Sequence, residues 1–103
     1  MNLPEATKLY ETIVVTRHKN LLAYLISVGL VEESTPWFAY ANEETIFGKH
    51  VIGTLPLRLS KYAAYYTEIP LRVPYEKKGL ELELEDIRYY VQAPQTYVIK
   101  EIT

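Results

Sequence analysis

Two short apolar runs in this chain are each followed by apolar residues at helical spacing. The first run is Thr-Ile-Val-Val at residues 12–15, and the apolar positions after it are Leu21, Leu22, Leu25 and Ile26. A β-branched run predicts a buried strand, and apolar residues three and four apart predict an amphipathic helix. The pattern therefore predicts a strand over residues 12–16 and a helix over 18–28, which Gly29 ends as a C-terminal cap.

The second run is Val-Ile at residues 51–52, directly before a glycine. It predicts a strand over residues 50–53, and Gly53 permits a sharp turn at the end of that strand. Thr54 can cap a following helix, and Pro56 falls in the first helical turn, where a missing N–H costs no hydrogen bond. The chain therefore makes the same corner twice, a strand followed by a turn and a helix.

The rest of the chain gives weaker signals. The second helix is predicted over residues 55–66, because one helical face would carry Leu55, Leu59, Tyr62 and Ala63. Further strands are predicted at residues 37–41, 68–73 and 96–102, and a short helix is predicted to begin at about Glu83. The remaining segments are a leader without a clear element at 1–11, a polar connection at 30–36 and an exposed turn at 76–79.

Strands that alternate with helices predict a mostly parallel sheet with right-handed crossovers. The predicted fold is a small Rossmann-like α/β domain of three layers, and residues 1–103 are long enough for one such domain. Ligands of such sheets bind beyond the carboxyl ends of the strands, near the switch in strand order. Both corners lie at strand carboxyl ends, so residues 16–19 and 53–56 are expected to share one site.

A strand–turn–helix corner suits an anion, because it points free backbone N–H groups and the positive end of a helix dipole beyond the sheet. The sequence Gly-Thr-Leu-Pro at 53–56 matches neither phosphate-loop pattern in which glycines and a lysine stand at fixed offsets. A purely structural corner is therefore the alternative interpretation.

The start of the first predicted helix carries three basic or potentially basic residues, Arg17, His18 and Lys19. The helix dipole favours acidic side chains there, and basic ones cost a few tenths of a kcal/mol each. These side chains could simply extend into water, or they could surround an anion held at the helix N-terminus. Three such residues together favour the second interpretation more than one would.

Composition narrows the classes of protein. The chain has no cysteine, which excludes a disulfide framework and a thiolate metal site and fits a reducing cytoplasm. No apolar run approaches the length of a membrane span, and residues 1–5 lack the basic and apolar regions of a signal peptide. A formal net charge of -2 argues against a broad nucleic-acid-binding surface. We therefore expect a cytoplasmic protein with no membrane and no double-stranded DNA partner, in which any anion site is local.

Several sequence blocks resemble a known family. They are Val-Thr-Arg-His at 15–18, Gly-Lys at 48–49, Val-Ile-Gly-Thr-Leu-Pro-Leu at 51–57, and Lys-Gly-Leu-Glu-Leu at 78–82 followed by Glu-Asp at 85–86. In order and spacing they resemble a small CRISPR-associated family of type III systems, the Csx-sixteen family. The resemblance implies a Rossmann-like fold, a homodimer, and a ring nuclease that degrades cyclic oligoadenylate, the second messenger of these systems.

Cleavage of an RNA phosphodiester without a metal needs an aligned ribose 2′-OH, stabilisation of charge on the phosphorane, and proton transfer near neutral pH. Arg17 supplies a planar phosphate donor, and histidine is the side chain that ordinarily titrates near neutrality. Arg17 and His18 are therefore the candidate catalytic residues. The candidate ligand-binding residues are Thr16, Lys19, Gly53, Thr54, Leu55 and Pro56. No metal and no cofactor are expected, and the products would be linear oligoadenylates with a 2′,3′-cyclic phosphate.

Other residues favour structural roles. His50 precedes a buried strand, which makes a structural role more plausible than a place in the site, and two histidines without a carboxylate pattern give no convincing metal set. Tyrosines at apparent helical spacing are more simply packing or dimer-interface residues than adenine platforms; they are Tyr62, Tyr65, Tyr66, Tyr89 and Tyr90. The acidic run at 81–86 is interpreted as a solvated face rather than a glycosidase pair.

Two other functions stay open. A protein that binds and sequesters the cyclic nucleotide would need the same pocket but no general acid or base. An adaptor dimer would use tyrosine-rich helices to bind a protein partner, and its basic corner would be incidental.

Overall fold

The structure, a computed structural model, describes residues 2–103 and contains one five-stranded sheet. The strands are β1 (Thr12–Val15), β2 (Trp37–Phe38), β3 (His50–Gly53), β4 (Tyr65–Glu68) and β5 (Gln95–Tyr97). Their order in the sheet is β2-β1-β3-β4-β5; the first four are parallel, and β5 runs antiparallel to β4. The predicted mostly parallel sheet is confirmed.

The helices are short. They are η1 (Glu5–Leu9), α1 (Lys19–Ser27), α2 (Glu43–Ile46), α3 (Leu57–Ser60), η2 (Tyr75–Lys77) and α4 (Leu84–Tyr90), of which η1 and η2 are 3₁₀-helices. Gly29 follows α1 with a φ of 77°, as expected of a C-terminal glycine. Glu83 begins α4 through a capping box with Asp86, which confirms the short helix predicted from about Glu83.

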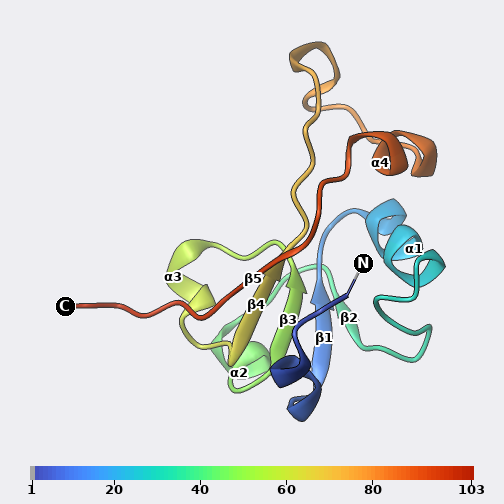
Figure 1. The fold of residues 1–103 in the computed structure, drawn as a ribbon. Coiled ribbons are helices and arrows are strands. Elements are labelled where there is room, and N and C mark those ends of the chain that lie inside the picture. The colour runs from blue at the N-terminus through green and yellow to red at the C-terminus, as the bar shows by residue number, and fades with distance from the viewer. Residues whose placement is uncertain (1) are drawn as a thin grey trace.

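The sheet separates two hydrophobic clusters, so the domain has three layers (Figure 1). On one face Val14 and Ile52 pack with residues from α1, α4 and the adjoining loops, including Leu21, Leu25 and Ile87. On the other face Ile13, Val15 and Val51 pack with Ile46 of α2 and Leu55 before α3. Successive strand residues point to opposite faces, and burial on both faces explains why the two β-branched runs are apolar throughout. The three-layer Rossmann-like α/β fold is confirmed.

The helix predicted over residues 55–66 is wrong. The helix α3 ends at Ser60, and Ala64 N–H donates to the carbonyl of Lys49 at 2.9 Å, which starts the pairing of β4 with β3. The next three residues, Tyr-Tyr-Thr, are strong strand formers and pair with His50, Val51 and Ile52. Tyr62, Tyr65 and Tyr66 therefore share no helix, which removes most of the expected tyrosine-rich helical surface.

The strand predicted over residues 68–73 is also wrong. Beyond Glu68 the chain leaves the sheet in the yellow to orange segment of Figure 1, and Leu71 makes one isolated bridge with Val91. Pro70 and Pro74 lack an N–H and so cannot donate to a ladder there.

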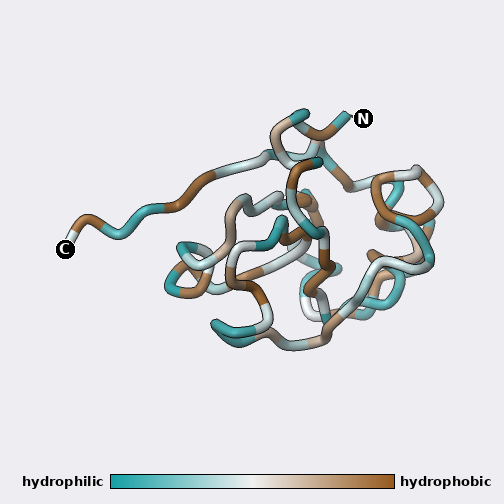
Figure 2. The backbone as a smooth tube through the Cα atoms, turned by 90° about the horizontal axis from the view of Figure 1, so that it is seen from below, coloured by the Kyte–Doolittle hydropathy of each residue, from teal (hydrophilic) through white to brown (hydrophobic). Residues whose placement is uncertain are grey.

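Three other boundaries differ from the prediction. The strand at 37–41 contains β2 only as Trp37–Phe38, and residues 1–11 contain the 3₁₀-helix Glu5–Leu9. The strand at 96–102 is Gln95–Tyr97, after which the chain runs past α3, where Glu101 pairs with Lys61. It ends as a tail with separate hydrophobic stretches (Figure 2). In the part of the chain that the structure describes, no helix has the length and apolar character needed to cross a membrane.

Candidate functional site

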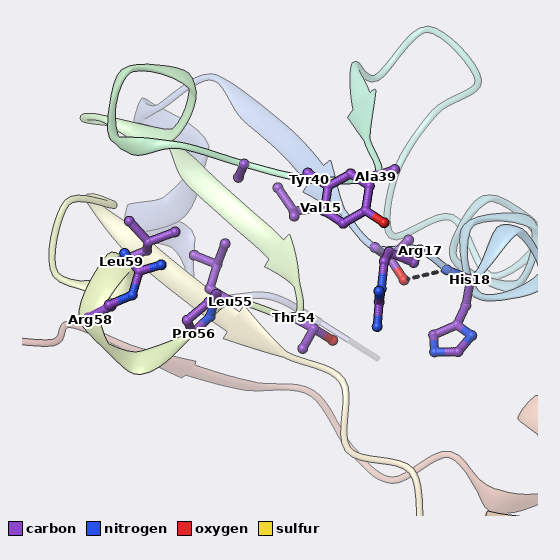
Figure 3. Close-up of a pocket in the computed structure, with 12 residues that line it drawn as sticks. Val15, Arg17, His18, Ala39, Tyr40, Thr54, Leu55, Pro56, Arg58 and Leu59 are labelled. Carbon is purple, nitrogen blue, oxygen red and sulfur yellow. Dashed lines mark hydrogen bonds between the residues drawn. The ribbon is translucent and has the colours of Figure 1, made fainter. Parts of the chain in front are cut away.

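The carboxyl ends of β1, β2 and β3 meet at one edge of the sheet, because Val15 pairs with both Phe38 and Gly53 in parallel registers. The strand order reverses between β1 and β3, which is where ligands of open α/β sheets bind. A cavity of about 560 Å³ lies at this edge and is called the site pocket (Figure 3). It is lined by Val15, Thr16, Arg17, His18, Ala39, Tyr40, Ala41, Thr54, Leu55, Pro56, Arg58 and Leu59.

The segment after β1 is fixed by hydrogen bonds of Thr16. This residue is almost fully buried, and its Oγ1 accepts a bond from His18 N–H at 3.1 Å. Its backbone N–H donates to the carbonyl of Phe38 at 3.0 Å, and its carbonyl accepts from Nε1 of Trp37 at 2.8 Å. Thr16 therefore anchors the chain, while the next two side chains, Arg17 and His18, are exposed at the pocket (Figure 3).

The first turn of α1 carries no acidic side chain, and Glu81 is the acidic residue that lines the neighbouring hollow with Arg17, His18 and Lys19. His18 is the N-cap residue, its side chain makes no capping bond, and the first turn contains no Asp or Glu. The basic residues therefore stand beside the positive end of the helix with no first-turn carboxylate to neutralise them. This arrangement has a cost in the free protein that a bound anion would relieve.

The second corner differs from its prediction. Thr54 N–H donates to the Val15 carbonyl at 2.9 Å, and Leu55 N–H donates to the Tyr66 hydroxyl at 3.0 Å. The expectation that these backbone groups are free for an anion is therefore wrong. The expected cap is wrong too, since the N-cap of α3 is Pro56 and not Thr54. What this corner offers the pocket is side chains, above all Thr54 and Arg58.

Tyr66 holds this corner from β4. Its hydroxyl donates to the Gly53 carbonyl at 3.2 Å while it accepts the bond from Leu55 N–H. Burial raises the pKa of the Tyr66 hydroxyl, which keeps the proton needed for the donated bond. One side chain thus closes the turn between β3 and α3.

Most predicted site residues meet in one place. Thr16, Arg17, His18, Thr54, Leu55 and Pro56 all line the site pocket. Gly53 lies directly before it at the end of β3. Lys19 does not line the site pocket; it lines a neighbouring hollow of about 500 Å³ beside residues 79–82, and Arg17 and His18 border both cavities. The predicted juxtaposition of the two corners is confirmed.

Six of the lining residues were not predicted from the sequence, and two of them, Tyr40 and Arg58, have polar side chains. Tyr40 lies two residues beyond β2, and its ring centroid is 5.7 Å from Cζ of Arg17. Arg58 belongs to α3 and lines the opposite side of the pocket (Figure 3). Extending the β1–β2 register by two residues would have placed Tyr40 opposite Arg17, but the sequence alone does not give that register.

His50 lies at the amino end of β3, away from the pocket at the carboxyl end. Its ring is buried, with Nδ1 hydrogen-bonded to Thr12 Oγ1 at 3.2 Å and Nε2 to Thr67 Oγ1 at 2.7 Å. Burial lowers the pKa of His50 from 6.5 to about 4, so the ring is neutral at pH 7. His50 is therefore a structural residue, as its position before the strand predicted. Within residues 2–103 no three His, Asp or Glu side chains form a group that could hold a metal ion.

Comparison with known proteins adds the family. No curated protein and no solved structure matched the chain. A family model described as "Putative CRISPR-associated protein (Cas_VVA1548)" matches residues 13–100. Apart from Thr12, the first residue of β1, that range contains all five strands, both corners and every residue that lines the site pocket. The chain therefore belongs to the Cas_VVA1548 family of CRISPR-associated proteins.

Proposed function

We propose that this protein is a ring nuclease that degrades cyclic oligoadenylate, with cyclic tetra-adenylate as the first substrate to test, and so ends a type III CRISPR signal. The observation that carries the proposal is the composition of the site pocket. Its lining includes Arg17, His18 and Arg58 but no aspartate or glutamate, although the whole chain has a formal net charge of -2. A basic pocket on an acidic protein favours a compact anionic ligand over a long polyanion.

The proposed reaction uses the ribose 2′-OH as nucleophile. The 2′-OH gives up its proton as its oxygen attacks the neighbouring phosphorus, the bond from phosphorus to the 5′ oxygen breaks, and the 5′ oxygen takes up a proton. The products are linear oligoadenylates with a 2′,3′-cyclic phosphate and a 5′-OH, and neither a metal nor a cofactor enters the balance. Arg17 donates to the phosphorane oxygens, and His18 transfers a proton.

The other pocket residues bind the cyclic oligoadenylate. The Thr54 hydroxyl and the Arg58 guanidinium supply polar contacts from the second corner, and Leu55 and Pro56 supply apolar walls. Thr16 fixes the backbone that carries Arg17 and His18, and Gly53 permits the turn that carries Thr54. Lys19 binds a phosphate of the ligand that reaches the neighbouring hollow. A cyclic ligand made of equivalent nucleotides suits a homodimer, because a two-fold axis would present each corner twice.

The test is incubation of the purified protein with cyclic tetra-adenylate in EDTA, followed by chromatography of the nucleotide. We expect linear products from the wild-type protein and a loss of at least about tenfold in rate for Arg17→Ala and for His18→Ala, in line with single acid–base or charge-stabilising groups. Arg72→Ala is a matched control, since Arg72 is exposed and does not line the pocket.

The two other functions predict different results. Retention of the nucleotide without products would identify a sequestering protein and contradict the nuclease. If the protein neither binds nor cleaves cyclic tri-, tetra- or hexa-adenylate, the nuclease and the sequestering protein are both contradicted, and the adaptor dimer remains. Sedimentation with and without the nucleotide tests the homodimer separately.

A further inference from the structure

We propose that Tyr40 is a positioning residue, which holds the Arg17 guanidinium at the mouth of the site pocket through a cation–π contact. The inference rests on the proposed function only for the identity of the ligand that Arg17 would bind. Cζ of Arg17 lies 5.7 Å from the Tyr40 ring centroid, inside the range of roughly 6 Å in which a guanidinium is attracted to an aromatic face. Figure 3 shows the two side chains next to each other on one side of the pocket.

The backbone fixes this pair. Val15 pairs with Phe38, and the bonds of Thr16 to Phe38 and to Trp37 extend the contact beyond the last ladder position. Arg17 and Tyr40 lie two residues beyond Val15 and Phe38, the last paired residues of β1 and β2. The sheet therefore brings the two side chains together before any ligand binds.

Folding does not explain an aromatic ring at position 40. The side chain of Tyr40 is 74% exposed, and Tyr40 belongs to neither hydrophobic cluster. An exposed ring at a cavity that also carries an arginine indicates a role in the site.

The kind of partner matters for Arg17. Four lysines in residues 2–103 are paired with carboxylates: Lys8, Lys49, Lys61 and Lys77. Lys61 and Lys77 also lie over tyrosine rings, whereas Arg17 lies over a tyrosine ring and has no carboxylate partner within the described residues. A carboxylate occupies N–H donors and neutralises the charge, whereas an aromatic face restrains a guanidinium and leaves its edge donors and its charge available. An arginine side chain that is free in solvent loses rotamer freedom when a ligand fixes it. Tyr40 thus reduces the entropy cost of binding phosphate without competing with it.

The experiment combines Tyr40→Leu, Tyr40→Phe and Arg17→Ala in a double-mutant cycle, with binding of cyclic tetra-adenylate measured by calorimetry. We expect Tyr40→Leu to weaken binding about two- to fivefold, the effect of an exposed cation–π contact, and Tyr40→Phe to bind as the wild type does. In the Arg17→Ala background Tyr40→Leu should have no further effect. Tyr75→Leu is the matched control, because Tyr75 is 87% exposed and lies outside the pocket.

A second readout does not depend on the nucleotide. Ring currents should shift the side-chain protons of Arg17 upfield in the NMR spectra of the wild type and Tyr40→Phe, and not in Tyr40→Leu. If the wild type binds no cyclic oligoadenylate, the proposed function fails, and the spectra still decide whether Tyr40 holds Arg17. An equal loss from Tyr40→Leu with and without Arg17 would overturn the positioning role, since Tyr40 would then contact the ligand itself. Equal Arg17 shifts in all three proteins would overturn it as well.

Discussion

The Val15 carbonyl oxygen and the α-carbon of Gly53 approach so closely that a Cβ on residue 53 would lie 1.9 Å from that oxygen. Gly53 also has a φ of +136°, which side chains rarely adopt. The same Val15 oxygen accepts the bond from Thr54 N–H at 2.9 Å. Contact between β1 and β3 at the edge of the pocket therefore depends on the absence of a side chain at position 53.

Gly53→Ala is expected to lower the free energy of unfolding by about 3 kcal/mol, because backbone on both strands must move and the new side chain is strained. Urea denaturation measures the change. Gly48→Ala is the control, since Gly48 has a φ of 71° but open space around it, and it should cost only about 1 kcal/mol. Equal losses in the two variants would show that the close approach to Val15 has no effect of its own.

Tyr66→Phe is expected to destabilise the protein by about 1–2 kcal/mol, because Leu55 N–H and the Gly53 carbonyl each lose a bond partner. It should also lower the rate of any reaction in the site pocket, since Thr54 and Leu55 stand on the turn that Tyr66 holds. Denaturation and the cyclic tetra-adenylate assay are the measurements. Tyr65→Phe is the control, because the Tyr65 hydroxyl makes no hydrogen bond within residues 2–103.

The sequence predicted the parts of the fold that local pattern determines. The β-branched runs at 12–15 and 51–52 fit a sheet that is covered on both faces, and they form β1 and the centre of β3. The helix over 55–66 failed because Leu55, Leu59 and Tyr62 share a helical spacing, whereas the following tyrosines pair with β3. The pairing of this segment with β3, which is distant in sequence, determines that it forms a strand. Local propensity carries no information about that pairing.

The candidate site was predictable to a similar degree. The rule that ligands bind at strand carboxyl ends placed residues 16–19 and 53–56 together, as the site pocket confirms for most of them. Tyr40 and Arg58 enter through the β1–β2 register and the true start of α3, neither of which the sequence gives. The backbone N–H groups of the second corner are bonded within the protein, and the sequence does not show this either, because their acceptors lie on other strands.

Arg58→Ala is expected to weaken cyclic tetra-adenylate binding and to reduce its dependence on salt. The side chain lines the pocket, and removal of one phosphate contact should lower the slope of log affinity against log salt by about 0.7, the value per contact for single strands. Titrations from low to high salt measure the slope. Arg88→Ala removes an exposed arginine on α4 outside the pocket and should leave it unchanged. An unchanged slope for Arg58→Ala would remove Arg58 from the ligand contacts.

His50 should make stability depend on pH between about 4 and 6.5. Its pKa is about 4 in the folded protein, against the ordinary value of 6.5 in an unfolded chain, so within this range the unfolded chain binds more protons than the folded one. The free energy of unfolding is therefore highest above pH 6.5 and falls as the pH is lowered, by up to about 3 kcal/mol at pH 4. Below pH 4 the group should contribute no further loss.

Urea denaturation at several pH values, on the wild type and on His50→Gln, isolates this contribution. The variant loses the bonds to Thr12 and Thr67 and should be less stable at pH 7, but the part of the slope that comes from His50 should be absent. Parallel curves for the wild type and His50→Gln would mean that protons reach the buried ring without unfolding the sheet, in which case burial does not hold His50 neutral.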